Sequence, residues 1–157
     1  MKIEIGQQAP DFYLFDSTKN KITLSEHRGR NVLLLFFPLA FTSTCTKELC
    51  SVRDNIRIYN DYNSIVFGIS VDSPQSLARY KEDQQLNFSL LSDFNKEVSA
   101  LYGCLYESFT GMELKGVSKR SSFIIDKDGI IRFKQILESA GDLPDFESIH
   151  QKLIKLS

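Results

Sequence analysis

A continuous apolar run at residues 31–37 constrains the fold more than any other feature of the chain. The run does not alternate apolar with polar residues, as a strand with one wet face would, so it is expected to be a central strand buried on both faces. Pro38 ends this strand. From Ser43 the pattern becomes helical, with apolar residues at three- and four-residue spacing between Leu49 and Tyr59. The local order is therefore strand, loop, helix.

The rest of the chain continues this alternation of strands and helices. A second apolar run at 65–71 is followed by Ser73 and Pro74, a helix-start signal for a helix through about residue 85. The remaining expected elements are a hairpin at 11–24, a short helix at 95–102, strands at 121–126 and 130–137 joined by an Asp-Gly turn, and a helix at 145–156. The β, α, β, α order favours parallel pairing. This order predicts an α/β protein of the thioredoxin-like fold, in which helices flank a central mixed β-sheet and an N-terminal extension precedes it.

Composition limits the classes of partner. The 157 residues are 42% hydrophobic and show no repeat or linker-like run, so we expect residues 1–157 to form a single domain. The 19 Lys and Arg residues against 20 Asp and Glu give a net charge of −1, which argues against nucleic acid and membrane surfaces as partners. The N-terminus lacks the pattern of a secretory signal, and no apolar run approaches the ~18 residues of a membrane span. We therefore expect a cytoplasmic protein.

Three cysteines carry the chemical information. In a reducing compartment a nearby pair such as Cys45 and Cys50 is more often catalytic, redox-active or metal-binding than a permanent bridge. Cys45 falls at a helix start, where unpaired amides and the helix dipole stabilise a thiolate by on the order of 0.3 to 1 kcal/mol. That is too little to make a reactive thiolate, so a fixed cation is needed as well. No metal site is expected, because His27 and His150 are far from every cysteine in sequence, and no cofactor motif is visible.

Pro38, Thr42 and Cys45 form a Pro-x-x-x-Thr-x-x-Cys motif, and Arg120 directly precedes the strand expected at 121–126. With these residues the chain resembles the peroxiredoxins of the AhpC/TSA family along essentially its whole length. The spacing of Cys45 and Cys50 resembles the bacterioferritin comigratory, or Q-type, group. The segment 37–42 instead resembles the E-type group, which generally lacks the second cysteine.

The resemblance implies an antioxidant thiol peroxidase that reduces hydrogen peroxide and small organic hydroperoxides. Cys45 would attack the peroxide and become a sulfenic acid. Arg120 would contact the thiolate and the peroxide, Thr42 would bind the peroxide, and Pro38 would shield the site. Glu48 would hold the arginine. An apolar collar is expected from Phe37, Leu39 and Phe41.

The Q-type resemblance also implies that Cys50 resolves the sulfenic acid as an intramolecular disulfide with Cys45, which thioredoxin or a similar dithiol would reduce. Five residues along a helix separate two Cα atoms by about 8.7 Å, whereas a disulfide needs about 4.4 to 6.8 Å. The start of the helix must therefore unwind before the bond can form.

Several alternatives stay open at the level of sequence. Cys50 is also typical of a small core residue, in which case an external thiol would resolve Cys45. Cys104 is a reserve resolving residue, although a structural role is favoured. A peroxide-sensing thiol oxidoreductase shares the first chemical step, and a catalytically silent interaction domain is a third class. The stretch 107–117 is either a loop over the pocket or a surface turn. The family resemblance also suggests a homodimer.

Overall fold

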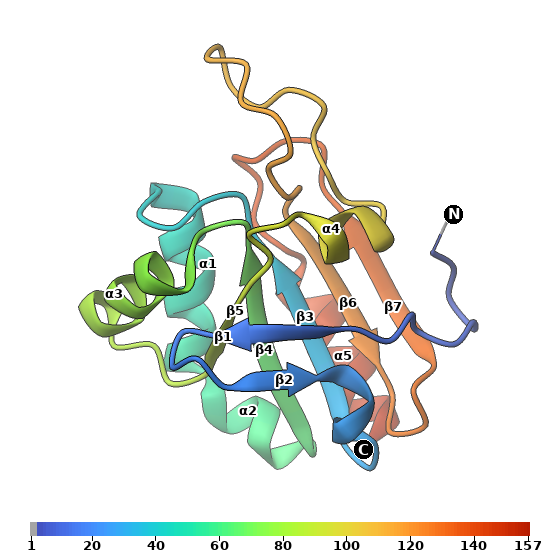
Figure 1. Cartoon of the computed structure of the whole chain (residues 1–157). Coiled ribbons are helices and arrows are strands. Elements are labelled where there is room, and N and C mark those ends of the chain that lie inside the picture. Colours follow the sequence, from blue (N-terminus) through green and yellow to red (C-terminus); the bar gives the residue numbers. More distant parts are fainter. Residues whose placement is uncertain (1–2) are drawn as a thin grey trace.

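A seven-stranded mixed sheet runs through the computed structural model, which describes residues 3–157 (Figure 1). Within these residues, no helix is both long enough and apolar enough to cross a membrane. The elements in chain order are β1 (Tyr13–Asp16), β2 (Lys21–Thr23), the 3-10 helix η1 (Leu24–His27), β3 (Asn31–Phe36), α1 (Ser43–Asp54), α2 (Ile56–Asp61), β4 (Ser64–Ser70), α3 (Pro74–Gln84), β5 (Ser89–Ser92), α4 (Glu97–Leu101), β6 (Ser121–Ile125), β7 (Ile131–Ile136) and α5 (Phe146–Leu156).

The sheet has the strand order β2-β1-β5-β4-β3-β6-β7. Strands β3, β4 and β5 are parallel, which confirms the parallel pairing expected between the two apolar runs. β6 is antiparallel to β3, and β7 is antiparallel to β6. At the other edge β1 is antiparallel to both β5 and β2. The predicted mixed sheet of a thioredoxin-like fold is thereby confirmed.

Strand β3 lies at the centre of two hydrophobic cores. All six of its residues are buried, and successive side chains point to opposite faces of the sheet. Leu33 and Leu35 pack with residues of α1, α2, α3 and α5, which cover one face. Leu34 and Phe36 pack on the other face with residues of η1 and α4. The uninterrupted apolar run is therefore explained by burial on both sides.

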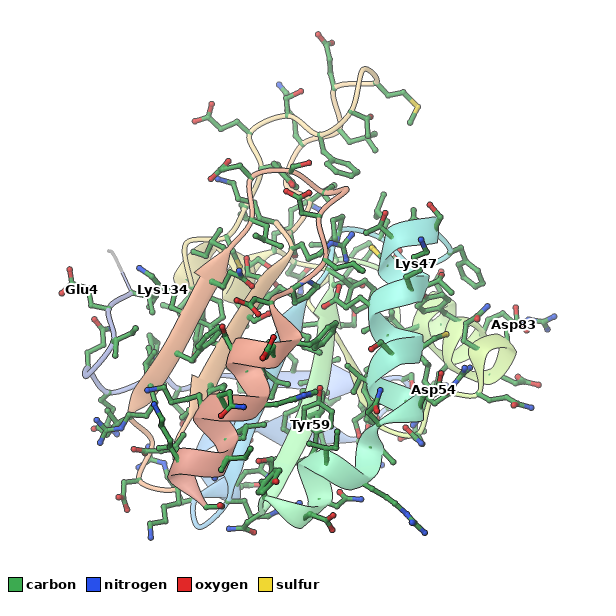
Figure 2. All side chains as sticks on the ribbon, turned by 180° about the vertical axis from the view of Figure 1, so that it is seen from behind. Glu4, Lys47, Asp54, Tyr59, Asp83 and Lys134 are labelled. Carbon is green, nitrogen blue, oxygen red and sulfur yellow. The ribbon has the colours of Figure 1, made fainter. Side chains whose placement is uncertain are left out.

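The helices α1, α2 and α5 lie in front of the sheet in Figure 2. Tyr59 of α2, labelled there, points toward α5, where its hydroxyl lies 3.0 Å from Nε2 of His150. The helix α5 buries Ile149 and Leu153 completely in the core beneath it. These contacts fix the helical layer that carries α1.

Two features of the fold differ from the expectation. The helix expected between Ser43 and Tyr59 is two helices, α1 and α2, which are separated at Asn55, whose side chain donates a hydrogen bond to the Ser51 carbonyl. Asparagine competes for backbone hydrogen bonds and so favours helix ends. Strand β5 was not expected, because its four residues give too short a pattern to recognise.

The segment between α4 and β6 protrudes from one end of the molecule (Figure 1). It is closed by isolated antiparallel bridges between Leu105 and Ser118 and between Phe109 and Leu114. We call residues 105–118 the arm. The arm contains the irregular stretch whose place the sequence left undecided.

The adjacent residues Leu153 and Ile154 of α5 provide a matched test of the packing. Leu153 is fully buried and Ile154 is 42% exposed. Leu153→Ala should lower the free energy of unfolding by about 2 to 5 kcal/mol, because it leaves a cavity in the core. Ile154→Ala should cost less than about 1 kcal/mol. Urea unfolding measures both, and equal losses would contradict the packing of α5 described above.

Candidate active site

Cys45 is the third residue of α1, and its side chain is 1% exposed. Thr42 is the N-cap residue, and the first amides of the helix have no intrahelical acceptor. Two hydrogen bonds hold the preceding loop against the end of β4 and the residues after it. The Phe37 amide donates to the Ile69 carbonyl at 2.9 Å, and the Ala40 amide donates to Asp72 Oδ2 at 2.8 Å. The helix start therefore has a fixed position at the carboxyl end of β3.

Arg120 reaches Cys45 although the two are 75 residues apart in sequence. It directly precedes β6, whose first residue, Ser121, is paired with Phe36 at the end of β3. This register places Arg120 beside the start of α1. Its Nη2 donates a hydrogen bond to Cys45 Sγ at 3.2 Å and another to the Ala140 carbonyl at 2.9 Å.

The contact with Arg120 outweighs the helix dipole as a stabiliser of a thiolate at Cys45. A hydrogen bond to a charged group contributes about 1.5 to 3 kcal/mol, against on the order of 0.3 to 1 kcal/mol for a helix terminus. The arginine is itself only 1% exposed, so water does not screen its charge effectively. The fixed cation that the sequence required is therefore present at the site.

Glu48 holds the other end of the guanidinium. Its Oε1 accepts a hydrogen bond from Arg120 Nη1 at 2.5 Å, and both side chains are buried. Burial raises the pKa of Glu48 to about 7, against the opposing effect of Arg120. Burial alone would lower the pKa of Arg120, but the charges of Glu48 and Cys45 outweigh burial and raise it. Arg120 therefore stays charged.

The buried ion pair is only partly satisfied. Among residues 3–157, neither Glu48 Oε2 nor Arg120 Nε has a hydrogen-bond partner. Buried polar atoms without a hydrogen-bond partner lower the stability of the fold, so this arrangement is not explained by packing alone. The pattern is typical of a functional site whose geometry is imposed by the surrounding fold.

Cys45 and Arg120 border a cavity of about 220 Å³. Its lining combines the start of α1 and the preceding loop with three residues from elsewhere in the chain besides the arginine: Pro38, Thr42, Ser43, Thr44, Cys45, Phe109, Arg120, Ala140 and Gly141. Phe109 comes from the arm, and Ala140 and Gly141 come from the loop between β7 and α5. A cavity of this volume can hold a small molecule.

Thr42 borders this cavity, and its hydroxyl proton already makes a hydrogen bond within the protein. Its Oγ1 donates to the Leu39 carbonyl at 2.8 Å. The oxygen lone pairs are therefore left to accept a hydrogen bond from a molecule in the cavity. An acceptor at Thr42 and a donor at Arg120 can together orient a small hydroxylic ligand.

The expected apolar collar is wrong. In the described part of the chain, neither Phe37, Leu39 nor Phe41 is among the residues that line the cavity. Phe37 is fully buried in the core, and Phe41 is 55% exposed on the outside of the loop. The apolar wall is made instead by Pro38 and Phe109 with Ala140. A large apolar residue, Phe109, in an otherwise irregular stretch is the feature of the sequence that could have indicated this part of the wall.

The other two cysteines lie in different environments. Cys50 is half-buried on α1, and its thiol donates to Gln84 Oε1 at 3.6 Å. Cys104 is fully buried in the core on the opposite face of the sheet, where burial raises its pKa to about 12. All three thiols are free. With α1 intact, the structure does not bring Cys45 and Cys50 together, and Cys104 is unsuited to react.

A larger groove of about 880 Å³ lies elsewhere, between β1 and α4. Aromatic residues such as Tyr13, Phe15 and Phe94 line it, and Asp93 contributes a carboxylate already bonded to two amides of α4. None of the described residues that line this groove is a cysteine or an arginine. The smaller cavity at Cys45 is therefore the candidate active site.

The AhpC/TSA family model matches residues 5–134, a range that contains every residue of the site except Ala140 and Gly141. Peroxiredoxin Bcp of Escherichia coli K12 is 39% identical over 130 residues, which cover 82% of this chain and 83% of the relative. Alkyl hydroperoxide reductase E of Mycobacterium tuberculosis H37Rv is 37% identical over 146 residues, which cover 91% of each chain.

A solved structure leads to the same family. The crystal structure of peroxidoxin BcpB from Mycobacterium tuberculosis has a TM-score of 0.87 and 29% identity, and the match covers 99% of both chains. The structure of a PrxQ variant from Xylella fastidiosa has the same fold, with a TM-score of 0.88. The expected resemblance to both the Q-type and E-type groups is confirmed, and this chain belongs to the AhpC/TSA family of peroxiredoxins.

Proposed function

We propose that this peroxiredoxin reduces hydrogen peroxide and small organic hydroperoxides with Cys45 as the nucleophile. The observation that carries the proposal is the hydrogen bond of 3.2 Å from buried Arg120 to Cys45 Sγ on the wall of a small cavity. A charged donor at this distance favours the thiolate, which is the nucleophilic form of cysteine. Arg120 also borders the cavity that a peroxide would occupy.

The first step is a displacement at oxygen. The Cys45 thiolate attacks one peroxide oxygen, a sulfur–oxygen bond forms, and the oxygen–oxygen bond breaks. The departing hydroxide or alkoxide takes a proton from water and leaves as water or an alcohol, and Cys45 becomes a sulfenic acid. Arg120 stabilises the negative charge as it moves from sulfur to the leaving oxygen.

The other site residues orient the peroxide and hold the arginine. Because the Thr42 hydroxyl donates to Leu39, its oxygen accepts the peroxide O–H and turns the peroxide bond toward Cys45. Pro38 and Phe109 limit the entry of water. Glu48 fixes the plane of the Arg120 guanidinium.

For the second step we propose that Cys50 attacks the sulfenic acid. The bond between the two sulfur atoms forms, the sulfenic oxygen leaves as water, and thioredoxin or a similar dithiol then reduces the disulfide. Both cysteines lie on α1, about 8.7 Å apart at their Cα atoms for an ideal helix, so the start of α1 must unwind. The half-buried position of Cys50 supports this, since a modest opening exposes it.

A second candidate is a one-cysteine peroxidase that an external thiol resolves. The bond from Cys50 to Gln84 and the packing of Cys50 against the core favour this candidate, since both are typical of a structural cysteine. A peroxide sensor that passes oxidation to a partner shares the first step. Pairing as a homodimer stays a prediction.

Cys45→Ser should abolish peroxide consumption, because serine at this position is not a nucleophile toward peroxide. Cys104→Ala is the matched control and should retain turnover, since Cys104 lies in the core away from the cavity. Peroxide loss is followed directly, and NADPH oxidation is followed with thioredoxin reductase and thioredoxin. Turnover by Cys45→Ser would refute the assignment, and a single stoichiometric burst by the wild type would favour the sensor.

Arg120→Lys should slow the reaction of the reduced protein with hydrogen peroxide by about a hundredfold or more, as for loss of one charged donor to a transition state. Lysine keeps the charge but replaces the planar guanidinium by a single nitrogen, whereas Arg120 reaches Glu48 with Nη1 and both Cys45 and Ala140 with Nη2. Arg132→Lys, which changes a half-exposed arginine paired with Asp126, should react at the wild-type rate. Stopped-flow experiments measure the rate at which each reduced variant reacts with hydrogen peroxide. Equal rates for both variants would show that Arg120 has no role in the reaction.

One equivalent of peroxide should convert the wild type to a Cys45–Cys50 disulfide, and Cys50→Ser to a sulfenic acid that dimedone traps. Intact-mass and peptide mass spectrometry distinguish these products. A persistent sulfenic acid in the wild type would instead establish resolution by an external thiol.

A further inference from the structure

Tyr80 of α3 makes a partly buried hydrogen bond to the first turn of α1. Its side chain is fully buried, and its hydroxyl oxygen lies 2.9 Å from Thr46 Oγ1. The Thr46 hydroxyl donates its one proton to the Thr42 carbonyl at 2.7 Å. Tyr80 must therefore be the donor to Thr46. Because burial raises the pKa of Tyr80 to about 12, its proton is present at every physiological pH.

The turn that receives this bond has weak support of its own. In the described part of the chain, the N-cap residue Thr42 makes no side-chain bond to the helix amides, because its hydroxyl bonds to Leu39 instead. Phe41, just before it, has a φ of +66°, a left-handed conformation that is strained for a residue other than glycine. Contacts from outside the helix therefore add to the support that the two bonds from Thr46 to the Thr42 carbonyl give this turn.

Tyr80 supplies such contacts on the side of α1 that faces α3. Its ring packs against the Phe41 ring with centroids 4.9 Å apart, and its hydroxyl bonds to Thr46. One side chain thus supports both the strained residue before the helix and the first helical turn. Arg120 holds the turn at Cys45.

We propose that Tyr80 is a positioning residue that holds the first turn of α1 folded and so sets how readily that turn unwinds after oxidation of Cys45. The proposal rests on the proposed function for its catalytic consequence, but not for its structural part. Loss of the Tyr80 hydroxyl should loosen the turn while the ring still packs on Phe41.

The consequence is a division between two fates of the sulfenic acid. While the turn is folded, Cys45 can react with a second peroxide, which transfers one oxygen to give a sulfinic acid and leaves as water or an alcohol. Once the turn is unwound, Cys50 can attack instead and release water. Tyr80 should therefore favour overoxidation, and its removal should favour the disulfide.

The structural part is tested by amide hydrogen exchange on the reduced proteins. Tyr80→Phe should raise the exchange rates of residues 43–50 by about two- to tenfold, the factor expected for loss of one hydrogen bond. Tyr102→Phe is the matched control, because it removes a buried tyrosine hydroxyl that bonds to Pro10 on the other face of the sheet. Equal exchange at 43–50 in the wild type and Tyr80→Phe would overturn the proposal.

Thr46→Val identifies the bond responsible. If the Tyr80–Thr46 bond holds the turn, Thr46→Val should raise exchange at 43–50 as well, and Tyr80→Phe should add little further in the double variant. Fully additive effects would show that Tyr80 acts in another way and would overturn the proposed bond.

The catalytic part is tested by treating the wild type, Tyr80→Phe and Tyr102→Phe with excess peroxide and measuring the ratio of sulfinic acid to disulfide by mass spectrometry. The ratio should fall severalfold in Tyr80→Phe alone. General damage to the site would slow both products and leave their ratio unchanged, which would contradict the proposal. If the wild type forms no disulfide, the proposed role of Cys50 fails, while the exchange experiment still tests the structural role of Tyr80.

Discussion

The hydrogen bond from buried Arg120 to Cys45 is the interaction on which the rest of the site depends. It connects residues that are 75 positions apart in sequence. The antiparallel pairing of β6 with β3 brings the arginine to the start of α1. Burial makes its charge effective, and Glu48 keeps it in place. The same burial leaves polar atoms of the pair unsatisfied, which is a cost in stability at a place where reactivity requires a fixed cation.

The start of α1 is subject to two opposed requirements. A folded helix places Cys45 against Arg120, whereas a disulfide with Cys50 on the same helix requires the turn to unwind. The contacts that hold this turn are few. Tyr80 and Arg120 supply them from α3 and from the start of β6, while the N-cap residue contributes none through its side chain to the helix amides of the described structure. A turn held in this way can respond to a change at one sulfur atom.

The sequence alone predicted much of this arrangement, for reasons that are local. The unbroken apolar run predicted the central strand, and the helix start after Pro38 placed Cys45. Arg120 was found through the family signature only, because pairing of β6 with β3 is not readable from local pattern. The expected collar was wrong because Phe37 is buried in the core and Phe41 packs against Tyr80 while staying half exposed. The contribution of Phe109 depends on how the arm folds over the cavity.

We propose that the reactivity of Cys45 depends on the contact of 3.2 Å between its Sγ and Nη2 of Arg120. The measurement is the rate at which iodoacetamide alkylates Cys45 in a variant whose only cysteine is Cys45, made with Cys50→Ser and Cys104→Ala, with and without Arg120→Met. Alkylation should be about tenfold or more slower in the variant that lacks Arg120, because the charged hydrogen bond to the sulfur is lost. Equal alkylation rates with and without Arg120 would show that the arginine does not activate Cys45.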